Sequence, residues 1–188
     1  MELTLPILQE KLKAWDGCAL SKTSNPVLGE GNPNADIMFI GEAPGAKENE
    51  LKRPFVGAAG KLLDELLESI NLKRSDIYIS NVVKYRPPAN RDPTDEEKEQ
   101  CMPWLKMEIA LIKPKVIVPL GRHALGHFFP TLGMTAAHGT PQKIKIDNEN
   151  SITIFPIYHP AAALHNGNFR GTLFEDFEAL NKFLSAAS

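Results

Sequence analysis

Four short apolar segments, each followed by a polar turn, constrain the fold of this chain most strongly. They are IMFI at 37–40, IYIS at 77–80, KVIVPLG at 115–121 and SITIFPIYHP at 151–160. Between the first two, apolar residues recur with the spacing of an amphipathic helix, at Leu62, Leu63, Leu66, Leu67 and Ile70. Strands that alternate with helices in this way predict an α/β fold with a mostly parallel sheet covered on both faces.

Helix signals fill the intervals between these strands. Further helices are expected at residues 6–13, from Arg122 and from Phe169. Thr94 and Glu97 have the spacing of a capping box and predict a helix that runs to about Ile112. Pro103 lies inside that helix and is expected to kink or loosen it, because proline lacks the backbone N–H. Residues 41–58 are expected to form a loop.

Length and composition suit a single domain over residues 1–188. The chain has 188 residues, of which 43% are hydrophobic, and a formal net charge of -2. Such a chain can bury a core of useful size, and its small net charge neither implies nor excludes nucleic acid. The acidic N-terminal segment predicts no signal peptide, and no apolar run reaches the length of a membrane span. Two cysteines, Cys18 and Cys101, favour a reducing compartment. We therefore expect a cytoplasmic protein, monomeric and without a membrane partner.

Polar side chains follow the predicted strands at the points where these end. Ligands of parallel sheets lie outside the carboxyl ends of the strands. The residues at these ends are Gly41-Glu42, Asn81, Gly121-Arg122 and His159-Pro160. A carboxylate, an amide and an imidazole would meet at one edge, which favours chemistry over passive binding.

The glycine-rich turn GEAPGAKE after the first strand resembles a phosphate-binding loop but lacks the residues that bind phosphate. It has Pro44 and two carboxylates, Glu42 and Glu48, in place of the lysine and hydroxyl of a phosphate loop. Glu42 either is a solvated residue of an ordinary turn or orients a water against an electrophilic carbon, as a general base does. The loop alone does not distinguish these interpretations.

Phe55, Asn81 and His159 each have an ordinary structural interpretation as well. Asn caps turns, a lone His is commonly satisfied by a backbone carbonyl, and Phe is usually a core residue. Phe55 nevertheless stands in a loop, RPFVG, bounded by proline and glycine. An amide that reads a base edge, an aromatic ring that stacks on it and an imidazole that bonds to it are what an enzyme needs to hold an extruded base.

Five ordered motifs carry a resemblance to a known family. GEAPG, RPFVGAAGKLLDELL, YISNVVKYRPPANRDPT, IKPKVIVPLGRHA and YHPAAAL, in this order and spacing, resemble the family 4 uracil-DNA glycosylases from about Trp15 to His165. The resemblance implies a three-layer α/β/α sandwich with a short, mainly parallel central sheet. It also implies a monofunctional glycosylase that flips deoxyuridine out of DNA, hydrolyses its N-glycosidic bond and leaves an abasic site and free uracil.

The resemblance also implies roles for individual residues. Gly41 and Glu42 would line the pocket, and Glu42 would activate the water, although Glu48 matches a second acidic position of the motif. Phe55 would stack on uracil, Asn81 would pair with its O4/N3 edge, and His159 would donate to O2. An acidic loop suits a sugar that becomes cationic in the transition state, whereas a phosphate loop would carry the wrong sign.

Two departures from the family are visible. Members carry four cysteines that hold a [4Fe-4S] cluster, and the matching positions here are Trp15, Cys18, Tyr85 and Cys101. We therefore expect no cluster and no metal, and an apolar plug in its place; the alternative is that the two cysteines share another metal or form a disulfide. In the loop HPAAALHN, Ala163 and His165 stand where the family more often has leucine and arginine.

Basic and apolar residues near the predicted pocket indicate a DNA face. Leu164 is the remaining candidate for a wedge that fills the gap left by a flipped base, with His165 beside it. The basic candidates are Lys52 and Arg53 beside Phe55, and Lys84, Arg86 and Arg91 after Asn81. A solvated loop is the ordinary alternative for such charges, and their place at the pocket edge favours DNA, single- or double-stranded.

Three other functions stay open from the sequence. The chain could bind uracil- or lesion-containing DNA without cleaving it, although a binder needs no carboxylate that orients water. It could act on another deaminated base, such as hypoxanthine or xanthine. A domain that binds small nucleotides is disfavoured because the phosphate loop is absent.

Overall fold

The computed structural model describes residues 3–145 and 151–187, and the expected domain of residues 1–188 extends beyond them. The strands are β1 (Glu30–Gly31), β2 (Ile37–Gly41), β3 (Tyr78–Asn81), β4 (Val116–Pro119), β5 (Gln142–Lys145) and β6 (Ser151–Ile154). The α-helices are α1 (Leu5–Lys13), α2 (Ala46–Leu51), α3 (Ala58–Ser69), α4 (Asp95–Ile112), α5 (Arg122–Phe128), α6 (Met134–Ala137), α7 (Ala161–His165) and α8 (Asn168–Ala187). Short 3₁₀ turns occupy Ala19–Lys22, Arg74–Asp76 and Pro88–Asn90.

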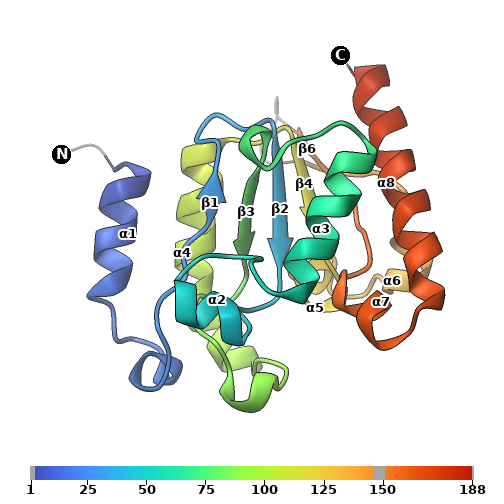
Figure 1. Ribbon diagram of the computed structural model, residues 1–188. Coiled ribbons are helices and arrows are strands. Elements are labelled where there is room, and N and C mark those ends of the chain that lie inside the picture. Colours follow the sequence, from blue (N-terminus) through green and yellow to red (C-terminus); the bar gives the residue numbers. More distant parts are fainter. Residues whose placement is uncertain (1–2, 146–150, 188) are drawn as a thin grey trace.

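One six-stranded sheet, in the order β1-β3-β2-β4-β6-β5, forms the centre of the molecule (Figure 1). The four inner strands are parallel, and β1 and β5 add antiparallel edges. The parallel strands are those expected from the apolar segments. The two edge strands were not predicted, because a two-residue strand and the half-polar QKIK segment carry little of the apolar signal by which buried strands are recognised.

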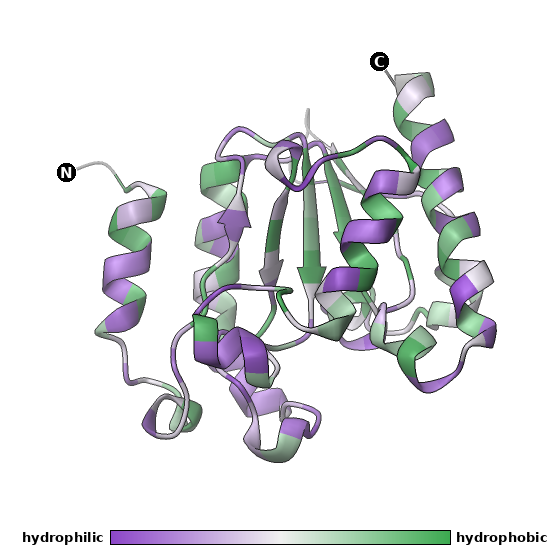
Figure 2. Ribbon diagram, viewed as in Figure 1, coloured by the Kyte–Doolittle hydropathy of each residue, from purple (hydrophilic) through white to green (hydrophobic). Residues whose placement is uncertain are grey.

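Alternation along β2 divides the core between the two faces of the sheet. Ile37 and Phe39 pack with α3 and α8, whereas Met38 and Ile40 pack with α1 and α4. This is the period-two pattern of a strand buried on both sides. Figure 2 shows the apolar residues concentrated on the central strands, with polar and apolar residues mixed on α3 and α8 as amphipathic helices require. The three-layer α/β/α sandwich is confirmed.

One local expectation was wrong. The segment 41–58 is not all loop, because Ala46–Leu51 forms the short helix α2. Helix α4 continues past Pro103 to Ile112, and its N-terminus has the expected capping box between Thr94 and Glu97. Pro103 is exposed, so water can satisfy the carbonyl that proline leaves without a partner.

The carboxyl ends of the parallel strands lie at one edge of the sheet, together with α2, α5 and α7 (Figure 1). Gly41 at the end of β2 is in register with Asn81 at the end of β3. Beyond β4, Leu120 bridges to Ile157, two residues before His159. The topology therefore brings the sequence-predicted residues to a common edge. Among the described residues, no helix is both long and apolar enough to cross a membrane.

Candidate active site

A cavity of about 550 Å³ opens at this edge. Loops that follow all four parallel strands line it, and its residues include Glu42, Pro44, Gly45, Arg91, Asp92, Gly121, Arg122, His123, His159 and His165. The carboxylate and imidazole expected from the sequence therefore face one space. Asn81 and Phe55 are buried beside it, with 2% and 5% of their surface exposed.

Gly41 makes room for two of the expected base-binding side chains. A Cβ at this position would lie 2.5 Å from Asn81 Oδ1 and 2.5 Å from the Cζ atom of Phe55. Real Cβ atoms do not approach other heavy atoms so closely, so a larger residue would displace the amide, the ring or both. The glycine in GEAPG is therefore required by the convergence of Asn81 and Phe55 over the end of β2.

Phe55 is held in an unusual backbone conformation. Its φ is 51°, in the left-handed region that non-glycine residues seldom occupy. Arg74 donates to the Phe55 carbonyl at 2.8 Å, and Gly60 lets α3 pass close beneath, since a Cβ there would lie 1.9 Å from the same carbonyl oxygen. Several contacts thus fix a strained loop that sequence patterns do not reveal.

The rings of Phe55 and His159 stack on each other. Their centroids are 5.6 Å apart and their planes differ by 28°. A base between them would need about 3.5 Å on each side, so no base fits there in this conformation. Because Phe55 is almost fully covered, a base can stack on it only if His159 or the Phe55 loop moves.

His159 is held as a neutral donor. The backbone N–H of Ala161 donates to its Nδ1 at 3.1 Å, so Nδ1 is unprotonated and Nε2 carries the hydrogen. Burial lowers the pKa of His159 to about 4, and the nearby negative charge of Glu48 opposes this only in part. At neutral pH the side chain therefore offers an uncharged Nε2–H.

Glu42 combines a fixed backbone with a side chain at the cavity. Its carbonyl accepts a hydrogen bond from the N–H of Val83 at 2.9 Å, which extends the β2–β3 pairing. Burial raises the pKa of Glu42; His123, with Nε2 3.7 Å from Glu42 Oε2, lowers it, and Asp92 raises it further. The carboxylate is thus partly desolvated and stands beside a titratable imidazole.

Glu48 lies behind the wall of this cavity. Its Oε1 accepts hydrogen bonds from the N–H groups of Val56 at 2.9 Å and Gly57 at 2.7 Å. Gly57 is the N-cap residue of α3, so the carboxylate stabilises the N-terminus of that helix and ties it to α2. The structure thus places Glu48 as an anchor of the Phe55 loop, with one oxygen committed to backbone donors.

Lys84 is not a surface residue, which corrects the expectation that it contacts DNA. Its side chain is fully buried and forms an ion pair with Glu108, which is equally buried. Lys84 Nζ also donates to Ser80 Oγ at 2.8 Å and to the Asn81 carbonyl at 2.6 Å. An ammonium committed to these three acceptors in the core cannot reach a phosphate; it supports the backbone of Asn81 instead.

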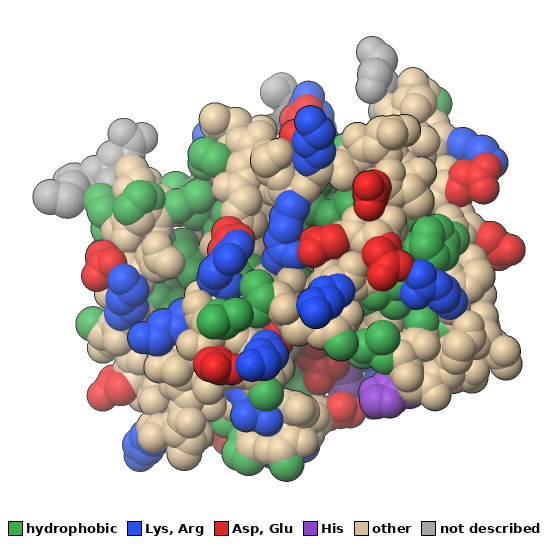
Figure 3. All heavy atoms as spheres, in the orientation of Figure 1, with side chains coloured by type: hydrophobic (Ala, Val, Ile, Leu, Met, Phe, Trp, Pro, Cys, Tyr) green, Lys and Arg blue, Asp and Glu red, His purple; other side chains and the backbone are tan. Residues whose placement is uncertain are grey.

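The other expected basic contacts do not gather at the cavity. Arg91 lines it but pairs with Glu97, and Arg86 bonds to Asn90 in the same loop. Lys52 and Arg53 line a hollow beside α1 and β1, where Arg53 pairs with Glu30. Figure 3 shows Lys and Arg side chains interleaved with Asp and Glu on the face that carries α2 and α3, without one continuous basic area.

The candidate wedge projects from the rim. Leu164 in α7 is 51% exposed; among the described residues, Leu51 in α2, at 53%, is the other large apolar side chain that is so exposed. His165 lines the cavity one residue further on, and Ala163 packs against the core. Leu164 is therefore the large apolar side chain that this helix exposes next to the cavity.

Three cavity residues were not assigned a role from the sequence. Arg122 stands at a predicted strand end, whereas no local pattern marked Asp92 or His123. Arg122 donates to Asp92 Oδ2 at 2.7 Å, and His123 Nε2 lies 3.1 Å from the same oxygen. The available signal for His123 was that it directly follows Arg122, which stands at that strand end. Asp92 comes from a loop, and only the tertiary structure brings it here.

The positions that match the cluster cysteines lie together but do not suit iron. Trp15 packs against Tyr85 and Trp104 with ring centroids 5.9 and 5.3 Å away, and the Tyr85 hydroxyl donates to the Trp15 carbonyl at 2.9 Å. Cys18 and Cys101 are fully buried. Burial raises the pKa of the Cys101 thiol to about 12, and the other two positions hold aromatic side chains, which offer no thiolate to iron. The residues present do not fit a [4Fe-4S] cluster.

Comparison with known proteins places this geometry in a family. A family model of the uracil DNA glycosylase superfamily matches residues 28–184. The Type-4 uracil-DNA glycosylase of Sulfurisphaera tokodaii is 45% identical over 186 residues, covering 95% of this chain and 84% of that protein. The Type-4 uracil-DNA glycosylase of Thermotoga maritima is 40% identical over 188 residues, covering 97% and 96%. This chain belongs to the uracil-DNA glycosylase superfamily.

Proposed function

We propose that the protein is a monofunctional DNA-repair glycosylase that hydrolyses the N-glycosidic bond of deoxyuridine in DNA. Uracil would leave as the free base, and an abasic site would remain. Curated relatives that cover nearly the whole chain are named Type-4 uracil-DNA glycosylases. The observation that carries the proposal is the convergence of Asn81, Phe55 and a neutral His159 beside the glycine at the end of β2.

Asn81 and His159 would recognise and activate the base. The Asn81 amide can offer a donor and an acceptor together, as the O4/N3 edge of uracil requires. The Nε2–H of His159 would donate to O2, on which negative charge develops as the C1′–N1 bond breaks. Such a hydrogen bond strengthens toward the transition state and therefore acts on the rate.

Glu42 would position the water that attacks the sugar. It faces the cavity, whereas Glu48 holds the start of α3 with one oxygen. Two carboxylates near a sugar that gains positive charge stabilise it electrostatically, so Glu48 would contribute charge rather than accept the proton of the water. This arrangement favours Glu42 as the general base.

Substrate binding would open the stacked pair. Uracil needs the face that Phe55 now turns to His159, so the flipped base would separate the two rings and stack on Phe55. Leu164 would fill the vacated position in the DNA, and Arg122, Arg86, Arg91 and His165 would meet the backbone around it. The substrate is uracil-containing DNA, single- or double-stranded.

The cluster of the family would be replaced by packing. Trp15, Tyr85 and Trp104 would form an apolar plug that ties α1 and the following loop to the Asn81 loop. We infer that the protein needs neither iron nor another cofactor, and that it acts in the cytoplasm as a monomeric single domain. One sheet that joins segments from Glu30 to Ile154 supports the single domain.

One assay separates this function from its rivals. Oligonucleotides with uracil, hypoxanthine or xanthine are incubated with excess protein and then treated with alkali. A glycosylase of the proposed kind cleaves the uracil strand only after alkali, and Glu42→Gln abolishes that product. Intact uracil in bound DNA would identify a binding protein instead, and preferential loss of hypoxanthine or xanthine would identify a different glycosylase.

A further inference from the structure

Three charged side chains surround the Nε2 atom of His123, and one of them is Glu42, the candidate general base. His123 Nε2 lies 3.1 Å from Asp92 Oδ2, 3.1 Å from Arg122 Nε and 3.7 Å from Glu42 Oε2. The His123 side chain is 18% exposed and that of Glu42 27%. Such partly buried groups interact more strongly than charges in open water.

A single nitrogen cannot satisfy all these neighbours in the neutral imidazole. If Nε2 carries the hydrogen, it donates to Asp92 and faces Glu42, but the Nε–H of Arg122 has no acceptor there. If Nε2 is bare, it accepts from Arg122, but its lone pair faces two carboxylates. In the protonated imidazole both ring nitrogens donate, so Nε2–H can serve Asp92 and Glu42, while the Arg122 Nε–H loses its acceptor there and Arg122 keeps its bond to Asp92.

The charges lead to the same conclusion. With His123 protonated, the four side chains carry no net charge; with it neutral, one negative charge is left over. Burial already favours the protonated, uncharged form of the Glu42 carboxyl, so this carboxyl is the one that gains a proton most easily. A cation beside it keeps it ionised and able to accept a proton from water.

We propose that His123 is a positioning residue of the glycosylase reaction, which holds Glu42 ionised and directed at the cavity while Asp92 and Arg122 hold His123. The inference rests on the proposed role of Glu42. The carboxylate and imidazole atoms of Glu42, Asp92 and His123 lie within 4.8 Å of one another, a spacing that metal ligands share. The guanidinium of Arg122 lies beside this group and donates to Asp92, so a side chain of the protein brings positive charge where a metal ion otherwise would.

Other charged groups around this cluster belong to α4. Lys98 lowers the pKa of Glu42 slightly, and His123 lowers that of Asp95. Lys98 and Asp95 pair with each other at 3.0 Å, so they form a separate ion pair that changes little when His123 is replaced. Asp92 comes from the loop before α4, and Arg122 and His123 come from α5.

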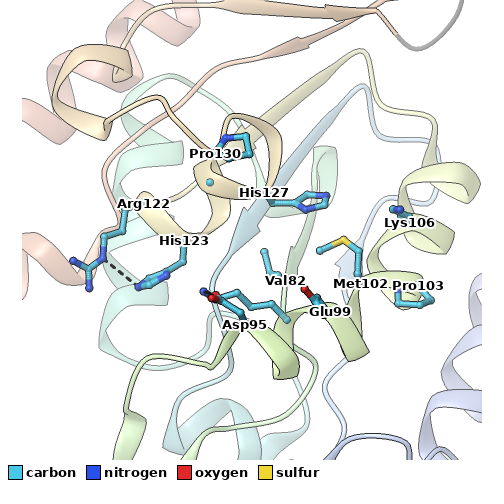
Figure 4. A pocket seen from close by; sticks show the side chains of 12 residues that line it. Val82, Asp95, Glu99, Met102, Pro103, Lys106, Arg122, His123, His127 and Pro130 are labelled. Atoms are coloured by element: carbon cyan, nitrogen blue, oxygen red, sulfur yellow. Dashed lines mark hydrogen bonds and ion pairs between the residues drawn. The ribbon is translucent and has the colours of Figure 1, made fainter.

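A second histidine on the same helix provides a matched control. A neighbouring cavity of about 810 Å³ lies between α4 and α5. Figure 4 shows Arg122 and His123 at one end of it and His127 directed toward Met102. His127 lies one helical turn beyond His123, is also partly buried, and is not among the groups that shift the pKa of Glu42. His127→Gln therefore controls for loss of an imidazole from α5.

The test is the pH profile of single-turnover uracil excision from an oligonucleotide. Ionisation of Glu42 sets its acid limb. His123→Gln retains a neutral donor but loses the positive charge. We therefore expect the acid limb to move up by about half to one pH unit, which is a three- to tenfold loss of rate on the acid side. The plateau rate should stay within about twofold of wild type. His123→Ala should move the limb equally and lower the plateau as well.

A second variant reverses the shift. In the His123→Gln background, where no imidazole titrates at this place, Asp92→Asn removes a negative charge that raises the pKa of Glu42, and the acid limb should move back down. A residue with a merely structural role would lower the plateau without opposite shifts of the limb. His127→Gln should leave the profile in place.

The outcomes separate the two proposals. If Glu42→Gln retains the wild-type rate, the proposed role of Glu42 fails, and the inference with it. If Glu42→Gln is inactive but the His123→Gln profile superimposes on that of wild type, the role of His123 alone is refuted.

Discussion

Replacing His159 with alanine tests how the neutral imidazole acts. The pKa of about 4 leaves roughly one molecule in a thousand protonated at pH 7, so the group that faces the base is an uncharged Nε2–H. Loss of one donor to a developing oxyanion costs about 2.7–4 kcal/mol of barrier, a factor of about 10² to 10³ in rate. We expect His159→Ala to reduce single-turnover excision by this factor.

The assay measures rate and affinity separately. Excision is followed with enzyme in excess over a labelled uracil oligonucleotide, and binding is followed by fluorescence anisotropy with a non-hydrolysable analogue. Affinity should fall by less than about tenfold, because the hydrogen bond forms fully only in the transition state. His159→Gln, which restores an N–H in a similar place, should recover part of the rate. An unchanged rate, or a loss of affinity as large as the loss of rate, would refute the reasoning.

The same imidazole makes stability depend on pH. In the unfolded chain it titrates near its ordinary pKa of 6.5 and in the folded chain near 4, so between these values the unfolded state binds more protons. The free energy of unfolding therefore falls as the pH drops from about 6.5 toward 4, by up to about 2 kcal/mol between pH 7 and pH 5. Urea denaturation at the two pH values should show that His159→Gln loses this part of the dependence.

Three further changes test the surrounding structure. Asn81→Asp should lower uracil excision and introduce some cytosine excision, since a protonated or reoriented carboxyl can accept the amino group; full uracil activity with no cytosine product would exclude Asn81 as the base reader. Lys84→Met should cost about 3–5 kcal/mol in urea denaturation, because Glu108 is left buried and unpaired. Lys84→Met combined with Glu108→Gln should recover much of the lost stability and leave the salt dependence of DNA binding unchanged. A shallower salt dependence would show that Lys84 contacts DNA. Purified protein should be colourless, without absorbance near about 400 nm, and Trp15→Cys with Tyr85→Cys, grown with iron, should gain some brown colour.

The parallel sheet and its helices could be predicted from the sequence because their signals are local. Apolar runs of strand length, the stripe from Leu62 to Ile70 and the capping box at Thr94 each arise from neighbouring residues. The same local logic located Gly41, Asn81 and His159, since parallel strands end at one edge whatever their order. The edge strands and α2 escaped prediction because short, polar elements depend on their partners rather than on their own composition.

Only the tertiary structure decided what each charged side chain does. Lys84 and Arg86 stand two positions apart in one loop, yet one is buried against Glu108 and the other is part-exposed. Glu48 has the sequence signature of an acidic active-site residue, but its distance from the start of α3 makes it a backbone anchor. The pKa of a carboxyl or an imidazole depends on burial and on charges from other elements, and no local pattern encodes these. The sequence by itself determined which residues reach the edge of the sheet; the fold determined which of them face the cavity, and in what protonation state.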